Sequence, residues 1–123
     1  MSALYGGTAS ALDDDGTAIV GEGGTATAGR YGAATAGDGG KAIVGYGGTA
    51  TAGYDGLAIA GDHGSANVGC DGTARAGTGG TFVIKWYDGK RDRLAVGYVG
   101  EDGILADTPY RCNGAGQLVQ VTA

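Results

Sequence analysis

The chain has 123 residues, the size of one domain, and 29 of them are glycine while only one is proline. Its formal net charge of −5 comes from acids in the first 80 residues, whereas nucleic acids and anionic membranes attract clustered Lys and Arg. We therefore expect no nucleic-acid partner and no membrane partner.

The first residues show no basic segment followed by an apolar one, so no secretory signal is predicted. No apolar run approaches the roughly 20 residues that span a bilayer. We expect a cytoplasmic protein, unless it is exported by a non-classical route or belongs to a virion. Cys70 and Cys112 are then expected to be free thiols, although the sequence leaves a disulfide between them open.

An eight-residue repeat fills the chain as far as residue 80. After one nine-residue step from Gly7 to Gly16, a glycine recurs at every eighth residue, and a second series from Gly21 to Gly77 keeps the same register. Each unit predicts a four-residue strand with alternating inward and outward side chains. A four-residue turn follows, whose two glycines are expected to tolerate positive φ.

Two sets of alternating strand positions are small and apolar, so both are expected to face inward. The first set is Ala9, Ala18, Ala26, Ala34, Ala42, Ala50, Ala58, Ala66 and Ala74, continued by Phe82. The second set is Ala11, Val20, Ala28, Ala36, Val44, Ala52, Ala60, Val68 and Ala76, continued by Ile84. No single octapeptide buries enough to fold alone, so the units are predicted to stack as an all-β, parallel β-solenoid.

The interior favours a flat, two-sided coil of 16 residues, made of two octapeptides. Alanine fits between two close sheets, whereas a triangular coil would leave a void that protein interiors do not tolerate. A 24-residue recurrence, as in Val20, Val44 and Val68, keeps a three-sided coil open as the alternative. Three intertwined chains, as in a phage-tail needle, are a third option.

Beyond residue 80 the strands become bulkier and predict an antiparallel β cap. Phe82, Trp86 and Tyr98 are expected to form its core. Strands are predicted at 81–87, 94–99, 110–112 and 117–121, and the last two as a hairpin. We assign residues 1–80 to the solenoid and 81–123 to the cap, which would cover an otherwise unpaired strand edge.

The segment Gly45-Tyr46-Gly47-Gly48-Thr49-Ala50-Thr51-Ala52-Gly53 resembles the octapeptide of bacterial ice-nucleation proteins, whose repeats form a flat β-solenoid. The whole plan, Gly/Ala/Thr octapeptides before a short Trp/Tyr β domain, also resembles bacterial and phage octapeptide-repeat proteins. A weaker resemblance, through G-x-x-S-x-A repeats, is to the heads of trimeric autotransporter adhesins. These resemblances imply an architecture and no activity.

Ile43, Leu57 and Ile59 are apolar but outward by register, and on a flat coil they would share one face of adjacent coils. Contiguous apolar patches tend to be interfaces, so this patch is the candidate self-association face. The N-terminal end has no visible cap, and we expect it to be covered in a homodimer or homotrimer.

Outward threonines and turn tyrosines are candidate contacts for ice or a glycan. They are Thr25, Thr27, Thr49 and Thr51 on strands, and Tyr31, Tyr46 and Tyr54 on turns. Ice recognition needs a regular threonine lattice, and on a flat coil the two Thr-x-Thr pairs would fall on opposite faces. An array this short is a poor template.

The sequence predicts no metal site, no cofactor and no catalytic centre. Glu22, Asp38, Asp55 and Asp71 should run along one edge as solvated turn carboxylates. His63 is the only histidine, and on a flat coil Cys70 would lie on the opposite edge.

We therefore favour a non-enzymatic structural or protein-interaction module that self-associates and has an unidentified protein partner. The alternatives are a surface template for ice or a glycan, and a segment of a trimeric fibre like those of phage tails or adhesin heads.

Overall fold

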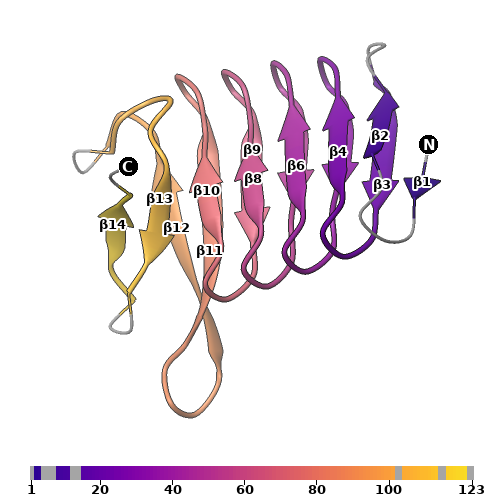
Figure 1. The fold of residues 1–123 in the computed structure, drawn as a ribbon. Helices are drawn as coiled ribbons and strands as arrows, with labels where there is room; N and C mark the ends of the chain where they lie inside the picture. The colour runs from indigo at the N-terminus through magenta and orange to yellow at the C-terminus, as the bar shows by residue number, and fades with distance from the viewer. Residues whose placement is uncertain (1, 4–7, 12–14, 102–103, 114–115, 122–123) are drawn as a thin grey trace.

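The structure is a computed structural model and describes residues 2–3, 8–11, 15–101, 104–113 and 116–121. Its strands form two sheets (Figure 1). The first sheet contains β1 (Ser2–Ala3), β3 (Thr17–Val20), β5 (Ala33–Thr35), β7 (Thr49–Thr51), β9 (Ser65–Val68), β11 (Thr81–Tyr87) and β12 (Asp92–Tyr98). The second contains β2 (Thr8–Ala11), β4 (Thr25–Ala28), β6 (Lys41–Val44), β8 (Leu57–Ile59), β10 (Thr73–Arg75), β13 (Tyr110–Cys112) and β14 (Leu118–Gln120).

Strand pairing confirms the β-solenoid and decides the size of its coil. Successive octapeptides alternate between the sheets, and parallel partners are 16 residues apart, as Thr25 and Lys41 are. Between β2 and β4 the interval includes the extra residue of the nine-residue step, since Thr8 pairs with Thr25. The flat coil is therefore confirmed and the 24-residue coil is wrong, because an alanine interior fills only the narrow space between two close sheets.

Alanine and valine methyl groups fill the interior. The alanines of the first inward set are at most 1% exposed, and the valines of the second inward set are at most 6% exposed. Both inward sets are confirmed for every member whose side chain the structure describes, which leaves out Ala11. In the first inward set, alanines of successive coils lie side by side, as Ala50 does beside Ala66.

The two recurring glycines of each turn have a different role from the predicted one. At the first turn position, a Cβ on Gly37 would lie 3.0 Å from the backbone nitrogen of Glu22 in the preceding coil. At the fourth position, a Cβ on Gly40 would lie 2.7 Å from the Cβ of Ala36. Positive φ occurs at the third position instead, for example 67° at Gly39. The prediction of positive φ at the recurring glycines is wrong; they are required by close packing within the turn, as between Gly40 and Ala36, and against the preceding coil, as between Gly37 and Glu22.

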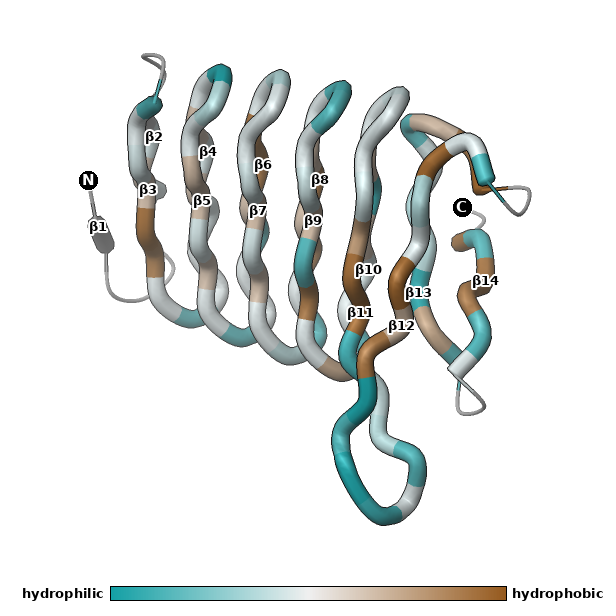
Figure 2. Tube along the Cα trace, turned by 180° about the vertical axis from the view of Figure 1, so that it is seen from behind, coloured by the Kyte–Doolittle hydropathy of each residue, from teal (hydrophilic) through white to brown (hydrophobic). Residues whose placement is uncertain are grey.

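The antiparallel cap is confirmed, and it begins in register with the coils. β11 first pairs in parallel with β9, with Phe82 beside Ala66, and along its length it pairs antiparallel with β12. In the second sheet β13 pairs antiparallel with both β10 and β14, which confirms the final hairpin. Because β11 is longer than the coil strands, the β11–β12 hairpin projects beyond the coils, and Figures 1 and 2 show it extending below them.

The cap core differs from the prediction at Trp86 and Tyr98, neither of which belongs to the cluster of buried residues. Phe82 is 0% exposed and stacks on Tyr110, with ring centroids 5.2 Å apart, while Trp86 is half-buried. Tyr98 is 53% exposed, so its predicted place in the core is wrong. The reason is register: Tyr98 lies opposite Thr81, and residues directly opposite on paired strands share a face, here the outward one.

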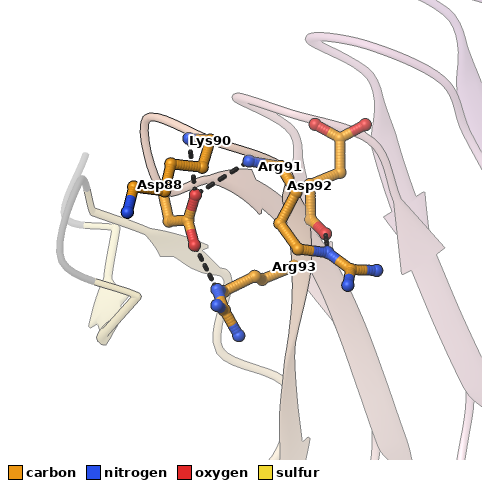
Figure 3. A network of polar contacts seen from close by, with 5 residues as sticks. All are labelled: Asp88, Lys90, Arg91, Asp92 and Arg93. Atoms are coloured by element: carbon orange, nitrogen blue, oxygen red, sulfur yellow. Dashed lines mark hydrogen bonds and ion pairs between the residues drawn. The ribbon is translucent and has the colours of Figure 1, made fainter.

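A polar network holds the tip of the projecting hairpin (Figure 3). The backbone N–H groups of Lys90 and Arg91 donate to Oδ1 of Asp88, at 2.7 and 2.9 Å. Its other oxygen, Oδ2, accepts from Nε of Arg93 in an ion pair. These donors, Arg93 first, lower the pKa of Asp88 to about 2.

Within the described ranges, no helix has the length and apolarity needed to cross a membrane.

Candidate functional site

The four candidate threonines lie on opposite sides of the molecule. Thr25 and Thr27 belong to β4 in the second sheet, and Thr49 and Thr51 to β7 in the first. On the next coil Thr25 and Thr27 are followed by Lys41 and Ile43, and Thr49 and Thr51 by Ser65 and Asn67. Neither sheet therefore carries the unbroken threonine rows that an ice template needs.

The candidate self-association residues are brought together on the second sheet. Ile43 lies directly opposite Ile59 on the paired strands β6 and β8, and Leu57 lies opposite Lys41. All three apolar side chains are half-buried, because neighbouring side chains on the sheet cover part of each. They form a small apolar cluster between Thr27 on one side and Arg75 on the other.

The candidate tyrosines divide between the two edges of the solenoid. We call the turns at 29–32, 45–48, 61–64 and 77–80 the upper edge, and those at 21–24, 37–40, 53–56 and 69–72 the lower edge, as oriented in Figure 1. Tyr31 and Tyr46 lie on the upper edge with their ring centroids 5.8 Å apart, and Tyr46 lies 5.4 Å from the ring of His63. Tyr54 lies on the lower edge.

The upper-edge rings cover glycines of the following coil. A Cβ on Gly47 would lie 2.7 Å from the ring of Tyr31, and one on Gly79 would lie 2.7 Å from the ring of His63. The three rings therefore form an aromatic row along the turns, which packs against the backbone. His63 is part of this row, and Cys70 lies on the lower edge, so the structure separates the two residues weighed as a catalytic pair.

Turn carboxylates tie adjacent coils together. Asp38 Oδ1 accepts a hydrogen bond of 3.0 Å from the backbone N–H of Tyr54, and Asp62 Oδ1 accepts one of 2.9 Å from that of Thr78. Glu22, Asp38, Asp55 and Asp71 do lie on the same edge, the lower one. Among the residues with described positions, no three His, Cys, Asp or Glu side chains are grouped closely enough to hold a metal ion.

A hollow of about 380 Å³ lies where the lower edge meets the cap, and we call it the corner groove. Five parts of the chain build it: two lower-edge turns, β11, β12 and the end of β13. Its lining residues are Tyr54, Cys70, Asp71, Lys85, Trp86, Tyr87, Asp92, Cys112 and Asn113. It exists because β11 extends past the coil and places Trp86 and Tyr87 beside the turn that contains Asp71.

Two further hollows adjoin the corner groove. One of about 540 Å³ shares Tyr54, Cys70 and Lys85 with it and continues over Thr51 and Val83 on the outer face of the first sheet. The other, of about 340 Å³, shares Asp71, Cys112 and Asn113 with the groove and reaches the second sheet. The depression therefore wraps around the lower edge at the cap.

The corner groove combines aromatic rings with charges of both signs. Tyr54 and Tyr87 are 55% and 58% exposed, and the ring of Trp86 lies against Gly116, where a Cβ would be 2.3 Å from it. The hydroxyl of Tyr54 donates to Asp71, and this hydrogen bond and the nearby negative charge raise the pKa of Tyr54. Burial raises the pKa of the Cys112 thiol. Both cysteines are free thiols.

A second exposed feature is the outermost strand of the first sheet. β12 follows β11 at the end of the strand order, so no strand of the described chain pairs with its far side. Its outward residues Leu94, Val96 and Tyr98 are 64%, 44% and 53% exposed, and Val83 lies opposite Val96 on β11. We call Leu94, Val96 and Tyr98 the β12 stripe.

Sequence reasoning missed both the corner groove and the β12 stripe. It selected Tyr54 and Thr51 singly, but it did not place them beside the cap. The adjacent pair Trp86-Tyr87 before a turn was the available signal for the groove, and the alternation of Leu94, Val96 and Tyr98 was the signal for the stripe.

Comparisons of the chain with protein-family models, curated proteins and solved structures found no match. The chemistry of these surfaces is therefore inferred from their own residues.

Proposed function

We propose that the chain is a non-enzymatic structural module that self-associates through the β12 strand. The observation behind this proposal is that β12 combines an unpaired side with an exposed apolar face. A strand edge presents backbone N–H and C=O groups that a further strand can pair with. The β12 stripe adds apolar surface that such a partner would remove from water.

The length of β12 supports a strand as the partner. β12 has seven residues, against three or four in each of the coil strands β2 to β10. Natural sheets blunt their edges with short strands, prolines or inward-pointing charges. β12 carries no proline, and its two charged residues, Asp92 and Arg93, lie at the hairpin end, which leaves the five uncharged residues 94–98 as the edge available for pairing.

A second copy of the same chain fits this edge. An antiparallel pairing centred on Ala95 would place Leu94 of each copy opposite Val96 of the other. The same register puts Asp92 opposite Tyr98 and Arg93 opposite Gly97, so no two like charges meet directly across the junction. Such a two-fold contact closes after two copies, which favours the homodimer over the homotrimer.

Analytical ultracentrifugation of the full chain tests this proposal. We expect the wild type to sediment at twice the mass of one chain at high concentration. The double variant Leu94→Lys with Val96→Lys should sediment as a single chain, because it places charges in the junction. A wild type that stays monomeric at every concentration would contradict the proposal.

Two control variants separate β12 from other apolar surfaces. Ile19→Lys changes an equally exposed residue, 47% against 44% for Val96, on the outer face of the same sheet but on β3. Ile43→Lys with Ile59→Lys changes the apolar cluster of the second sheet. The dimer should survive both controls, and its loss in the second control alone would move the interface to that cluster.

A further inference from the structure

We propose that the corner groove is a binding site for a neutral carbohydrate, with a sugar ring packed against Trp86. The groove adjoins the β12 contact of the proposed function, since Asp92 lines the groove and Leu94 lines the hollow beside it. The proposal rests on three features of the groove: its aromatic side chains, its balance of charges, and its size together with the support that Gly116 gives to Trp86.

Aromatic rings gather at the groove and stay partly exposed. Trp86 is the only tryptophan of the chain, and Tyr54 and Tyr87 line the same hollow at 55% and 58% exposure. Tryptophan and tyrosine offer a flat apolar surface together with a polar group. A pyranose ring has the matching chemistry, because one face presents C–H groups and its rim presents hydroxyls.

The charges of the groove favour a neutral ligand over an ionic one. Asp71 and Asp92 oppose an anion, while Lys85, lining the same hollow, opposes a cation. A ligand with several hydroxyl groups uses both kinds of side chain, because hydroxyls donate to carboxylates and accept from the ammonium group. A lysine-rich or methylated peptide would be attracted by the rings and carboxylates but repelled by Lys85.

The groove has the size and support of a binding site. Its volume of about 380 Å³ lies in the usual range of small-ligand pockets, and the adjoining hollow over Thr51 and Val83 offers room for a second sugar unit. Trp86 rests against Gly116, whose lack of a Cβ lets the ring approach the β13–β14 turn. The ring is therefore held in place before any ligand arrives.

Because Trp86 is the only tryptophan, its fluorescence reports directly on the groove. Maltohexaose, cellohexaose, chitohexaose and mannohexaose are the probes, each titrated into the full chain to about 10 mM, above the 1 mM dissociation constant of a weak site. We expect at least one of them to change the fluorescence saturably. Tyr87→Ala and Tyr54→Ala should each weaken that binding by about tenfold, from the loss of one ring contact.

Tyr31→Ala is the matched control, because Tyr31 is as exposed as Tyr87, 58%, but lies on the upper edge. Its binding should equal that of the wild type, and far-ultraviolet circular dichroism should show that all variants keep the β fold. An absence of saturable change with every hexasaccharide would overturn the proposal. A change with tetralysine and with no sugar would overturn it too, in favour of a cationic ligand.

Discussion

The coils fill the space between the two sheets with small side chains, and the cap fills it with large ones. In the coils the sheets lie so close that Ala34, Ala50 and their equivalents fill the interior completely. In the cap the same inward columns continue as Phe82 and Ile84, and Tyr110 packs against them from the second sheet. The coil interior therefore limits how large a side chain can be, while the cap depends on large side chains being present.

This difference also explains where hollows form. In the coils every turn repeats sixteen residues later and lies against its neighbour, with backbone hydrogen bonds such as that from Tyr31 N–H to the Tyr46 carbonyl. At the cap the repeat stops, and β11 extends past the coil edge. The corner groove lies at this junction, because no further coil covers the turn at 69–72.

The largest effect on stability is expected from removing the aromatic ring of Phe82 in the cap. Phe82→Ala would leave a cavity beneath Tyr110 and lower the free energy of unfolding by about 3–5 kcal/mol. Urea unfolding followed by circular dichroism measures this loss. Val83→Ala, the outward neighbour on β11, is the control and should cost far less. Equal losses in the two variants would mean that the cap does not depend on its core.

A smaller loss of stability is expected in the coils, where the change enlarges a buried side chain instead of truncating one. Ala50→Leu adds three carbon atoms where the side chain is 0% exposed, and we expect a loss of about 1–3 kcal/mol from overpacking between the sheets. The adjacent exposed residue gives the control, since Thr49→Leu should change stability by no more than about 0.5 kcal/mol. If Ala50→Leu unfolds at the wild-type urea concentration, the interior is not as thin as the structure indicates.

The smallest effect concerns the hairpin tip, which is held by side-chain charges as well as by its strands. The pKa of Asp88 is lowered from 3.8 to about 2, so its contribution to stability is present above pH 3.8 and is lost as the pH falls through about 2. Asp88→Asn should melt slightly below the wild type at pH 7 and together with it below pH 2. Thermal melts across this range measure the difference.

Asp92→Asn is the matched control for that experiment. In the network of Figure 3 it is the backbone oxygen of Asp92, not its carboxylate, that accepts a hydrogen bond, from Nε of Arg91. Its melting difference from the wild type should not follow the same pH window. A constant Asp88→Asn difference from pH 7 to pH 1 would show that the ion pair does not stabilise the hairpin.

The coil could be predicted because the same local pattern determines, in every octapeptide, which side chains face inward. Alternating alanines define the inward face, and their small size selects the flat coil over the triangular one. The role of the recurring glycines was missed because it depends in part on the distance to the preceding coil, as between Gly37 and Glu22, or between Gly40 and the carbonyl oxygen of Gly24. That distance is a property of stacking, and no single octapeptide contains it.

The candidate surfaces were harder to predict, because they depend on residues far apart in the chain. Tyr54 and Trp86 line the same groove only because β11 continues beyond the coil edge. Tyr98 was misplaced because one residue of register exchanges the inward and outward faces of a strand, and the loop before β12 does not reveal that register. The Thr-x-Thr pairs, by contrast, were assigned correctly to opposite faces once the flat coil was assumed.

The sixteen-residue pairing interval also acts as a unit of length for the molecule. Removing residues 33–48 would delete one whole coil and leave β11 on the same sheet, with the cap attached as before. Removing only eight residues would transfer every later strand to the other sheet and bring the projecting hairpin to the opposite side. Duplication or deletion of gene segments can therefore lengthen or shorten the array in whole coils, while half-coil changes reverse the side on which its terminal surfaces are displayed.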